Sequence, residues 1–386
     1  MFRFGEKEIE AFARVARSGR LFRYQAGGQC EKFEHRWCEY LGVKHATLTS
    51  SGTMALTAGL AGMGVGPGDE VIVPCHTYMA SAVAVLSVGA IPVITDIDES
   101  IMLSPEATEA AIGPRTKAIM PVHMWGLVAD MKSLMRIARR HKLLVIEDCS
   151  QCVGGGCEGR KVGTFGDVGV YSFNYYKNIT AGEGGCLVTD SAAIDQVARC
   201  MVDSCRYFWT GGEKDFKPFV YSSARPTEFM GAVLLAQLSR LDGMLKTLRR
   251  MKKRVLKETA DTGLKASPCH SLDHESGAKV MYRLPSAEAA KAFAEQAGGT
   301  VCGETGRHTY TAWEPILNHR VGHHPKFNPF LMEENQDCRM DYSADMCARS
   351  LEILATTVMV GLHPDLKSAD VKDLIARIRR AAADVL

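Results

Sequence analysis

Residues 171–185 read YSFNYYKNITAGEGG, so an apolar segment leads directly into a lysine and a glycine-rich turn. Such a segment is typical of a buried strand that ends where the chain reverses direction. The lysine, Lys177, follows Ser172 by five residues. A lysine amine held close to a hydroxyl and a glycine-rich turn suits the formation of a Schiff base beside a bound phosphate.

A second apolar strand lies about thirty residues upstream and ends in carboxylates. Residues 143–148 read LLVIED, and Gln151 follows three residues later. Open α/β sheets bind their ligands at the carboxyl ends of the strands. There Asp148 can pair with a pyridinium nitrogen and keep it protonated, which makes the ring an electron sink. Together with Lys177, this strand end predicts pyridoxal 5'-phosphate as the cofactor, with pyridoxamine 5'-phosphate as its form between two half-reactions.

Short apolar runs alternate with stretches of helix length across the first half of the chain. Strands are expected at residues 71–74, 91–96, 117–122, 143–147, 168–173 and 186–189, and helices at 80–88 and 131–141. Near-continuous apolar strands of this kind predict a sheet covered by helices on both faces, and thus an α/β fold. We expect residues 1–250 to hold an N-terminal helix, a large α/β domain and connecting helices, and residues 251–386 to form a smaller α+β domain.

The composition excludes several classes of protein. The 386 residues are 46% hydrophobic and 23% charged, as in soluble globular proteins, and a net charge of +2 gives no sign of nucleic-acid binding. The most apolar stretch, residues 71–94, is interrupted by two prolines and a histidine, which argues against a membrane span. The thirteen scattered cysteines, and an N-terminus without the apolar run of a signal peptide, predict reduced thiols and a cytoplasmic location.

Two further turns follow strands at the same predicted edge of the sheet. The segment Ser50-Ser51-Gly52-Thr53 joins an expected strand at 45–48 to an expected helix at 54–62, and small hydroxyl residues at a helix N-terminus suit a phosphate as well as an ordinary helix cap. Tyr78 follows the strand at 71–74 and could stack on a flat ring. The ordered set, rather than any one residue, predicts a single crevice.

Two other clusters contain residue types that occur in metal or redox sites. Cys149 and Cys152 form a Cys-x-x-Cys pair, but a structural zinc site usually needs a second such pair, so buried, unreactive thiols are expected. His319, His323 and His324 lie in a region, residues 303–336, that is expected to form irregular loops, and contact with substrate is favoured there over a metal. No metal is predicted.

The chain resembles the sugar aminotransferases of the DegT/StrS family, which have fold-type I and depend on pyridoxal phosphate. The similar segments are 51–53, 68–74, 121–126, 147–151, 163–169 and 172–185. The resemblance implies a large domain with a mostly parallel seven-stranded sheet. It also implies a ping-pong transfer of an amino group from an amino acid, glutamate or glutamine, to a ketone of a sugar or sugar-like acceptor, in amino sugar or secondary metabolite biosynthesis.

The resemblance also assigns roles to individual residues. Lys177 is expected to carry the cofactor and to act with Asp148 in catalysis. The residues expected to bind the cofactor are Gly52, Thr53, Tyr78, Asp148, Gln151, Ser172, Lys177, Ser223 and Arg225. Family members are homodimers in which an Asn-x-Arg segment reaches the partner's cofactor phosphate, but Ser223 stands here where the asparagine is usual. His76 is a second departure, because an aromatic or aliphatic residue is usual at that position.

Two alternatives remain open at this point. Some family members use pyridoxamine phosphate to dehydrate keto-sugars, but they carry a histidine in place of the lysine that is present here as Lys177. A regulatory protein that binds the cofactor without turnover is the other alternative, and the intact set of Lys177, Asp148 and Gln151 argues against it. The segments 206–221 and 303–336 match no assigned pattern, and they are expected to form the acceptor pocket.

Overall fold

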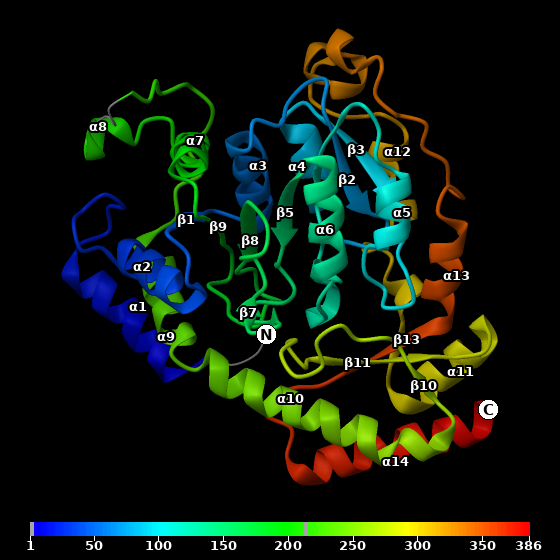
Figure 1. The fold of residues 1–386 in the computed structure, drawn as a ribbon. Helices are drawn as coiled ribbons and strands as arrows, with labels where there is room; N and C mark the ends of the chain where they lie inside the picture. The colour runs from blue at the N-terminus through cyan, green and yellow to red at the C-terminus, as the bar shows by residue number, and fades with distance from the viewer. Residues whose placement is uncertain (1–3, 212–214) are drawn as a thin grey trace.

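The computed structural model describes residues 4–211 and 215–386. Its largest element is a seven-stranded sheet with the strand order β1-β9-β8-β5-β4-β2-β3 (Figure 1). Within the described residues, β9 runs antiparallel to both of its neighbours, and the other adjacent strands are parallel. The predicted mostly parallel seven-stranded sheet is therefore confirmed. The strands are β1 (His45–Thr49), β2 (Glu70–Pro74), β3 (Ile91–Thr95), β4 (Thr116–Ile119), β5 (Leu144–Asp148), β8 (Val168–Ser172) and β9 (Gly185–Thr189).

Both faces of this sheet are buried, which explains why its strands read as continuous apolar runs. Alternate residues of β2 point to opposite faces: Val71 and Val73 pack in one core, and Ile72 packs in another. The first core includes residues of α3 (Gly52–Gly62), α4 (Ala80–Ser87) and α7 (Ala192–Val202), whereas the second includes α6 (Met131–His141) and parts of the C-terminal half. The remaining helices of this half are α1 (Glu6–Ser18), α2 (Gln29–Leu41), α5 (Pro105–Ala110), α8 (Tyr207–Thr210) and α9 (Glu228–Leu238).

Local sequence signals set the ends of several elements. The Asp130 carboxylate accepts a hydrogen bond from the N–H of Ser133 at 3.1 Å and caps α6, which has the predicted bounds. The other strands and helices expected between residues 71 and 189 are also present, with ends that differ by up to three residues. In addition, a two-stranded hairpin is formed by β6 (Gly156–Cys157) and β7 (Arg160–Lys161).

The C-terminal half contains a second sheet. It has four strands in the order β10-β11-β13-β12, and the neighbouring strands pair antiparallel. Helix α10 runs from below the large sheet to this small sheet and lies beside α14 (Figure 1). The predicted domain boundary at residue 250 falls inside α10. The division into two domains stays a prediction. The elements of this half are α10 (Leu241–Glu258), β10 (Lys265–Ala266), β11 (Lys279–Arg283), α11 (Ala287–Ala297), β12 (Thr300–Val301), α12 (Glu314–Leu317), α13 (Ala348–Thr356), β13 (Thr357–Gly361) and α14 (Ser368–Val385).

The segment 303–336 contains short helical turns joined by irregular backbone, as expected. It packs against the large sheet, because Trp313, Ile316 and Phe330 belong to the same buried cluster as Ile72. An isolated bridge between His76 and Thr309 ties this segment to the end of β2. No helix in the described part of the chain is long and apolar enough to cross a bilayer.

Candidate active site

A cavity of about 650 Å³ opens at the carboxyl ends of the parallel strands. Residues from β5, β8 and α3 line it, together with residues from the start of β11 and the loop after β12. Its wall therefore combines segments that are more than two hundred residues apart in the sequence. The predicted residues that line the cavity are Gly52, Thr53, Tyr78, Asp148, Gln151, Ser172 and Lys177.

One end of the cavity is formed by the N-terminus of α3. The Ser51 hydroxyl accepts a hydrogen bond from the N–H of Met54 at 3.1 Å, so it caps the helix as an ordinary N-cap residue does. The earlier N–H groups of Gly52 and Thr53 have no intrahelical acceptor and border the cavity. A Cβ atom on Gly52 would lie 2.9 Å from the Cβ of Ser172, so any side chain there would fill this end. The result is a narrow cup with backbone donors and a hydroxyl, suited to an anion.

Asp148 ends β5 and is 5% exposed. One carboxylate oxygen accepts a hydrogen bond from the Ser81 hydroxyl at 3.0 Å, and the other accepts one from the N–H of Ser150 at 3.0 Å. Ser81 lies in α4, is fully buried and also contacts the hydroxyl of Thr77 at 3.0 Å. These contacts fix the orientation of the carboxylate at the cavity wall.

Lys177 lies in the turn after β8 and shares the cavity with Asp148. Burial lowers the pKa of the Lys177 amine, the Asp148 carboxylate opposes that shift, and the Arg307 guanidinium adds to it. Lowering its pKa brings more of the amine into the neutral form that acts as a nucleophile or a base.

Gln151 and Trp125 form a linked pair at the cavity wall. The side-chain oxygen of Gln151 accepts a hydrogen bond from the backbone N–H of Trp125 at 3.1 Å. Trp125 has a φ of 54°, a conformation that side-chain-bearing residues rarely adopt, and such strain concentrates at functional sites. Tyr78 also borders the cavity and is 51% exposed.

Glu147 supports the loop beneath the site rather than lining the cavity. Its buried carboxylate accepts hydrogen bonds from the N–H groups of Gly163, Phe165 and Gly166 at 2.6–2.8 Å, and the His123 imidazole lies 3.3 Å away. These contacts satisfy a buried charge with several donors. They also tie the loop at residues 163–166 to the end of β5.

His76, one of the departures from the family pattern, is fully buried. Its Nε2 accepts a hydrogen bond from the indole N–H of Trp125 at 3.1 Å, and the His308 ring packs against Trp125 with centroids 4.5 Å apart. Burial lowers the pKa of His76 to about 3 and, with Arg307 and Lys177 nearby, that of His308 to about 4. Both imidazoles are therefore neutral at ordinary pH, and His76 holds Trp125 in place.

We expect His76→Phe to lower stability at pH 7 and to change its pH dependence. The Trp125 indole N–H would lose its acceptor, at a cost of about 1–3 kcal/mol. In the unfolded wild type, the His76 imidazole gains a proton near pH 6.5, whereas in the folded protein it gains one only near pH 3. Acidification between these values therefore destabilises the wild type by up to about 1.4 kcal/mol per pH unit, which the variant escapes. Denaturant unfolding at pH 7 and pH 4.5 should show the difference between the two proteins shrinking or reversing.

Replacement of the exposed His270 by phenylalanine is the matched control, and it should leave the pH dependence as in the wild type. A gap between the wild type and His76→Phe that stays constant from pH 7 to pH 4.5 would contradict the assignment of a neutral, buried His76.

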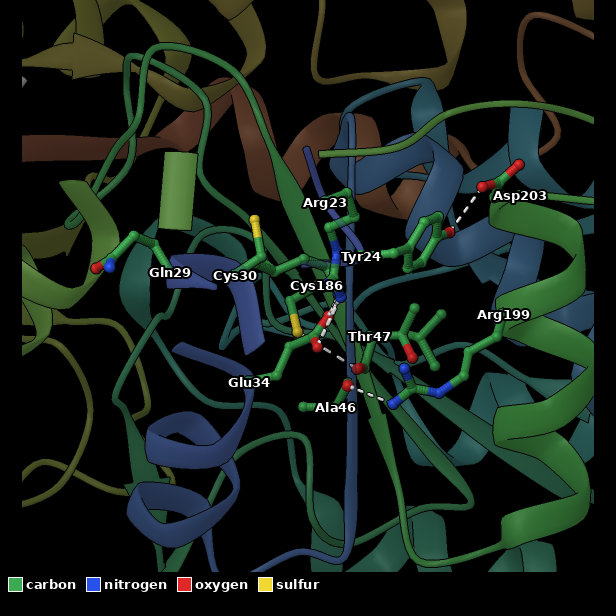
Figure 2. Close-up of polar contacts among 12 residues, drawn as sticks. Arg23, Tyr24, Gln29, Cys30, Glu34, Ala46, Thr47, Cys186, Arg199 and Asp203 are labelled. Carbon is green, nitrogen blue, oxygen red and sulfur yellow. Dashed lines mark hydrogen bonds and ion pairs between the residues drawn. The ribbon is translucent and has the colours of Figure 1, made fainter. Parts of the chain in front are cut away.

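Ser223 and Arg225 do not line the cavity of their own chain. The Arg225 guanidinium lies 3.6 Å from the carboxylate of Asp203, which is 1% exposed and also accepts a hydrogen bond from the Tyr24 hydroxyl at 2.6 Å. Figure 2 shows the hydroxyl end of the Tyr24 ring directed at the Asp203 carboxylate. Ser223 and Arg225 are held near the site by the residue between them in the sequence. The carbonyl of Ala224 accepts a hydrogen bond from the N–H of Ser50 at 3.1 Å. Their role toward a partner's cofactor stays a prediction.

The cysteine and histidine clusters lie outside the cavity. Cys149 and Cys152 are buried, unpaired thiols, and burial raises the pKa of Cys152 to about 12. The ring of His319 stacks on Phe330, and that of His323 stacks on Phe327, so these rings pack within their own segment. Two sets of potential metal ligands occur in the described residues, Cys75 with Asp96 and Cys347, and His123 with Glu147 and Cys149. The absence of a bound metal stays a prediction.

Several residues of the cavity were not singled out from the sequence. They are Trp125, Asn174, Tyr176, Glu183, Lys279, Arg307, His308 and His363. Arg307 and His308 lie in the segment 303–336, which was expected to contribute to the acceptor pocket, whereas Lys279 begins β11. No local motif marks these three residues, because only the packing of the C-terminal half brings them to the cavity.

Comparison with known proteins places this architecture among aminotransferases. Residues 3–379 match the model of the DegT/DnrJ/EryC1/StrS aminotransferase family. Among solved structures, 3-amino-5-hydroxybenzoic acid synthase is 27% identical with a TM-score of 0.80, and the alignment covers 100% of this chain and 98% of that one. An aminotransferase from Psychrobacter cryohalolentis is 25% identical with a TM-score of 0.80, covering 99% and 98%. The predicted fold-type I architecture is thereby confirmed.

Two relatives are more similar in sequence over part of their length. GDP-perosamine synthase of Caulobacter vibrioides is 43% identical over 225 residues, which are 57% of this chain and 59% of that protein. L-glutamine:2-deoxy-scyllo-inosose aminotransferase of Streptomyces kanamyceticus is 40% identical over 246 residues, which are 61% of this chain and 58% of that protein. The alignment thus spans about three fifths of the length of these relatives.

Proposed function

Because this chain belongs to the DegT/DnrJ/EryC1/StrS aminotransferase family, we propose that it is a pyridoxal-phosphate-dependent aminotransferase. It moves an amino group from an amino acid to the ketone of a sugar or sugar-like acceptor. The observation that carries the proposal is the meeting of Lys177 and Asp148 in one cavity beside the N-terminus of α3. An amine, a buried carboxylate and an anion cup are the three groups that the cofactor's aldehyde, ring nitrogen and phosphate require.

The residues present fit this cofactor. The cup at Gly52 has no room for a side chain, and it offers backbone N–H groups and the Ser172 hydroxyl to a phosphate. Asp148 is held by Ser81 and Ser150 in a fixed orientation at the wall, as a partner of a protonated ring nitrogen needs to be. Gln151 and Tyr78 border the space between these groups, where they suit a ring oxygen and a ring face.

The bound cofactor would supply an electron sink for the charge that develops when the donor loses its α-proton. The protein's own groups then divide the work. The Lys177 amine, with its pKa lowered by burial, holds the cofactor and later takes the α-proton as a general base. The Asp148 carboxylate would pair with the positive charge on the cofactor's ring nitrogen, and the Ser81 hydroxyl keeps this carboxylate oriented.

The names of the relatives indicate the substrate class. One relative is named for GDP-perosamine, and another for glutamine as donor and an inosose as acceptor. For this chain we propose glutamate or glutamine as the donor and a cyclic keto-sugar or keto-cyclitol as the acceptor. The reaction would then serve amino sugar or secondary metabolite biosynthesis.

The assembly and location that we propose follow the same reasoning. A homodimer with shared active sites is supported by the position of Arg225 beside, but outside, its own cavity, and by the exposed aromatic side chains of Phe208 and Trp209 near that surface. A cytoplasmic location is supported by thirteen cysteines that are all unpaired.

The proposal predicts that the enzyme loaded with pyridoxamine phosphate will convert to the lysine-bound pyridoxal phosphate form when it meets its acceptor ketone. The expected result is the return of the absorbance of that form with some members of a panel of cyclic keto-sugars and keto-cyclitols, and its loss again on addition of glutamate or glutamine. A panel without any response, combined with no effect of either amino acid on the lysine-bound form, would overturn the proposed activity.

A further inference from the structure

The cavity carries more positive charge than the proposed cofactor site uses. Its walls hold three cationic side chains, Lys177, Lys279 and Arg307, and two carboxylates, Asp148 and Glu183. The negative charge of Asp148 raises the pKa of the Lys177 amine, so these two charges interact. The Glu183 carboxylate accepts a hydrogen bond from the Asn174 side chain at 2.8 Å. Lys279 and Arg307 therefore remain as cations whose role the cofactor does not explain.

Lys279 lines the cavity from the start of β11. Its amine lies 6.0 Å from the centroid of the Trp125 ring, and burial lowers the pKa of this amine. Gly361 pairs with Lys279 across the sheet, and a Cβ atom on Gly361 would come within 3.2 Å of the amine. Among the described residues, no carboxylate lies within ion-pair distance of Lys279. Burying a cation in this way is costly unless an anion compensates it.

Arg307 stands on another part of the cavity wall, next to the proposed Schiff-base lysine. Its guanidinium lies over the ring of Tyr176, 5.4 Å from the centroid, and it lowers the pKa of both Lys177 and His308. No acidic partner for Arg307 occurs in the described ranges 4–211 and 215–386. An arginine placed on an aromatic ring keeps its planar fork free for a carboxylate or a phosphate.

We propose that Lys279 and Arg307 bind an oxyanion of the substrate, and that they thereby position the substrate's reacting carbon near Lys177. This inference rests on the proposed function. The cofactor's phosphate is not the anion in question, because the cup at the N-terminus of α3 already suits it. The oxyanion is either a carboxylate of the amino donor or a phosphate of the acceptor, and the two sources call for the same cations.

Equilibrium binding to the holoenzyme tests the proposal with unreactive probes. Calorimetric titration would use glutarate, a dicarboxylate without an amino group, for the donor, and GDP for an acceptor phosphate. We expect one probe to bind at least about tenfold more weakly to Lys279→Met and to Arg307→Gln, since each loses a charge-assisted contact. Lys279→Arg, which keeps the charge, should recover much of the affinity. Lys372→Met, at an exposed position on α14, is the matched control for loss of one positive charge.

The outcomes separate the two sources and the two proposals. Weakened binding of glutarate alone assigns the cations to the donor, and weakened binding of GDP alone assigns them to the acceptor. Wild-type affinity of both variants for both probes, or no binding of either probe to the wild type, would overturn the inference. The proposed activity would survive either of those results, because it is judged by the response of the wild type to ketones and amino acids.

Discussion

Replacement of Lys177 by alanine is expected to abolish the absorbance of the lysine-bound cofactor and to reduce amino transfer by at least about 10²–10⁴-fold. The Lys177 side chain has two proposed roles, to hold the cofactor and to move the α-proton. Among the residues that the structure describes, no other amine is placed to take over these roles. Lys279 lines the same cavity, but its amine lies near Trp125 and Gly361, and Asp148 is not among the groups that perturb its pKa. Absorbance spectra with added pyridoxal phosphate and single-turnover rates with glutamate measure the two effects.

The control for this experiment is an alanine at the exposed Lys372, which should leave both spectrum and rate unchanged. The thermal unfolding of cofactor-free Lys177→Ala should also match that of the cofactor-free wild type, because Lys177 makes no ion pair at contact distance in the described structure. An alanine variant that kept the wild-type spectrum and full turnover would show that the Schiff base forms elsewhere.

The part of the site that could be predicted from the sequence is the part built by local signals. Asp148 ends one apolar strand and Lys177 lies in the turn after another, and the carboxyl ends of parallel strands in one sheet meet at one edge. Their positions relative to the cavity therefore depend only on correct strand assignment. Ser51 and the start of α3 are similar, since a hydroxyl before a helical run marks a cap from the sequence alone.

The other wall of the cavity could not be predicted, for a physical reason. Lys279 and Arg307 reach it through the pairing of β11 with β13 and through the bridge between His76 and Thr309. These contacts join distant parts of the chain, and no short-range pattern encodes them. The sequence did mark residues 303–336 as irregular, and loops of this kind often carry binding residues.

His76 shows how an unusual residue acquires a meaning only in the structure. In the sequence it was a departure from the family pattern without a partner. In the fold its Nε2 is the acceptor for the Trp125 indole, and the Trp125 backbone in turn donates to Gln151. A hydrophobic residue at position 76 would leave that indole without this acceptor, so His76 and Trp125 have to be considered as one unit.

Asp148→Asn is expected to leave the cofactor bound to Lys177 and yet to slow removal of the donor's α-proton by about 10²–10⁴-fold. Asparagine has nearly the same shape, and its side-chain oxygen can still accept from the N–H of Ser150, while the Ser81 hydroxyl can turn to accept from the new amide. What is lost is the negative charge, and removing one partner of a buried charge pair costs about 3–5 kcal/mol. Exchange of the glutamate α-proton for deuterium, followed by NMR, measures this step directly.

Ser81→Ala is the graded companion of this variant, because it keeps the charge of Asp148 and removes one hydrogen bond that orients it. Loss of one such bond to a charged group corresponds to about 1.5–3 kcal/mol, so its exchange rate should fall between those of the wild type and Asp148→Asn. This order separates the effect of charge from the effect of orientation. An exchange rate in Asp148→Asn equal to that of the wild type would mean that the carboxylate does not support the charge of the cofactor ring, and Asp148 would then have only a structural role at the end of β5.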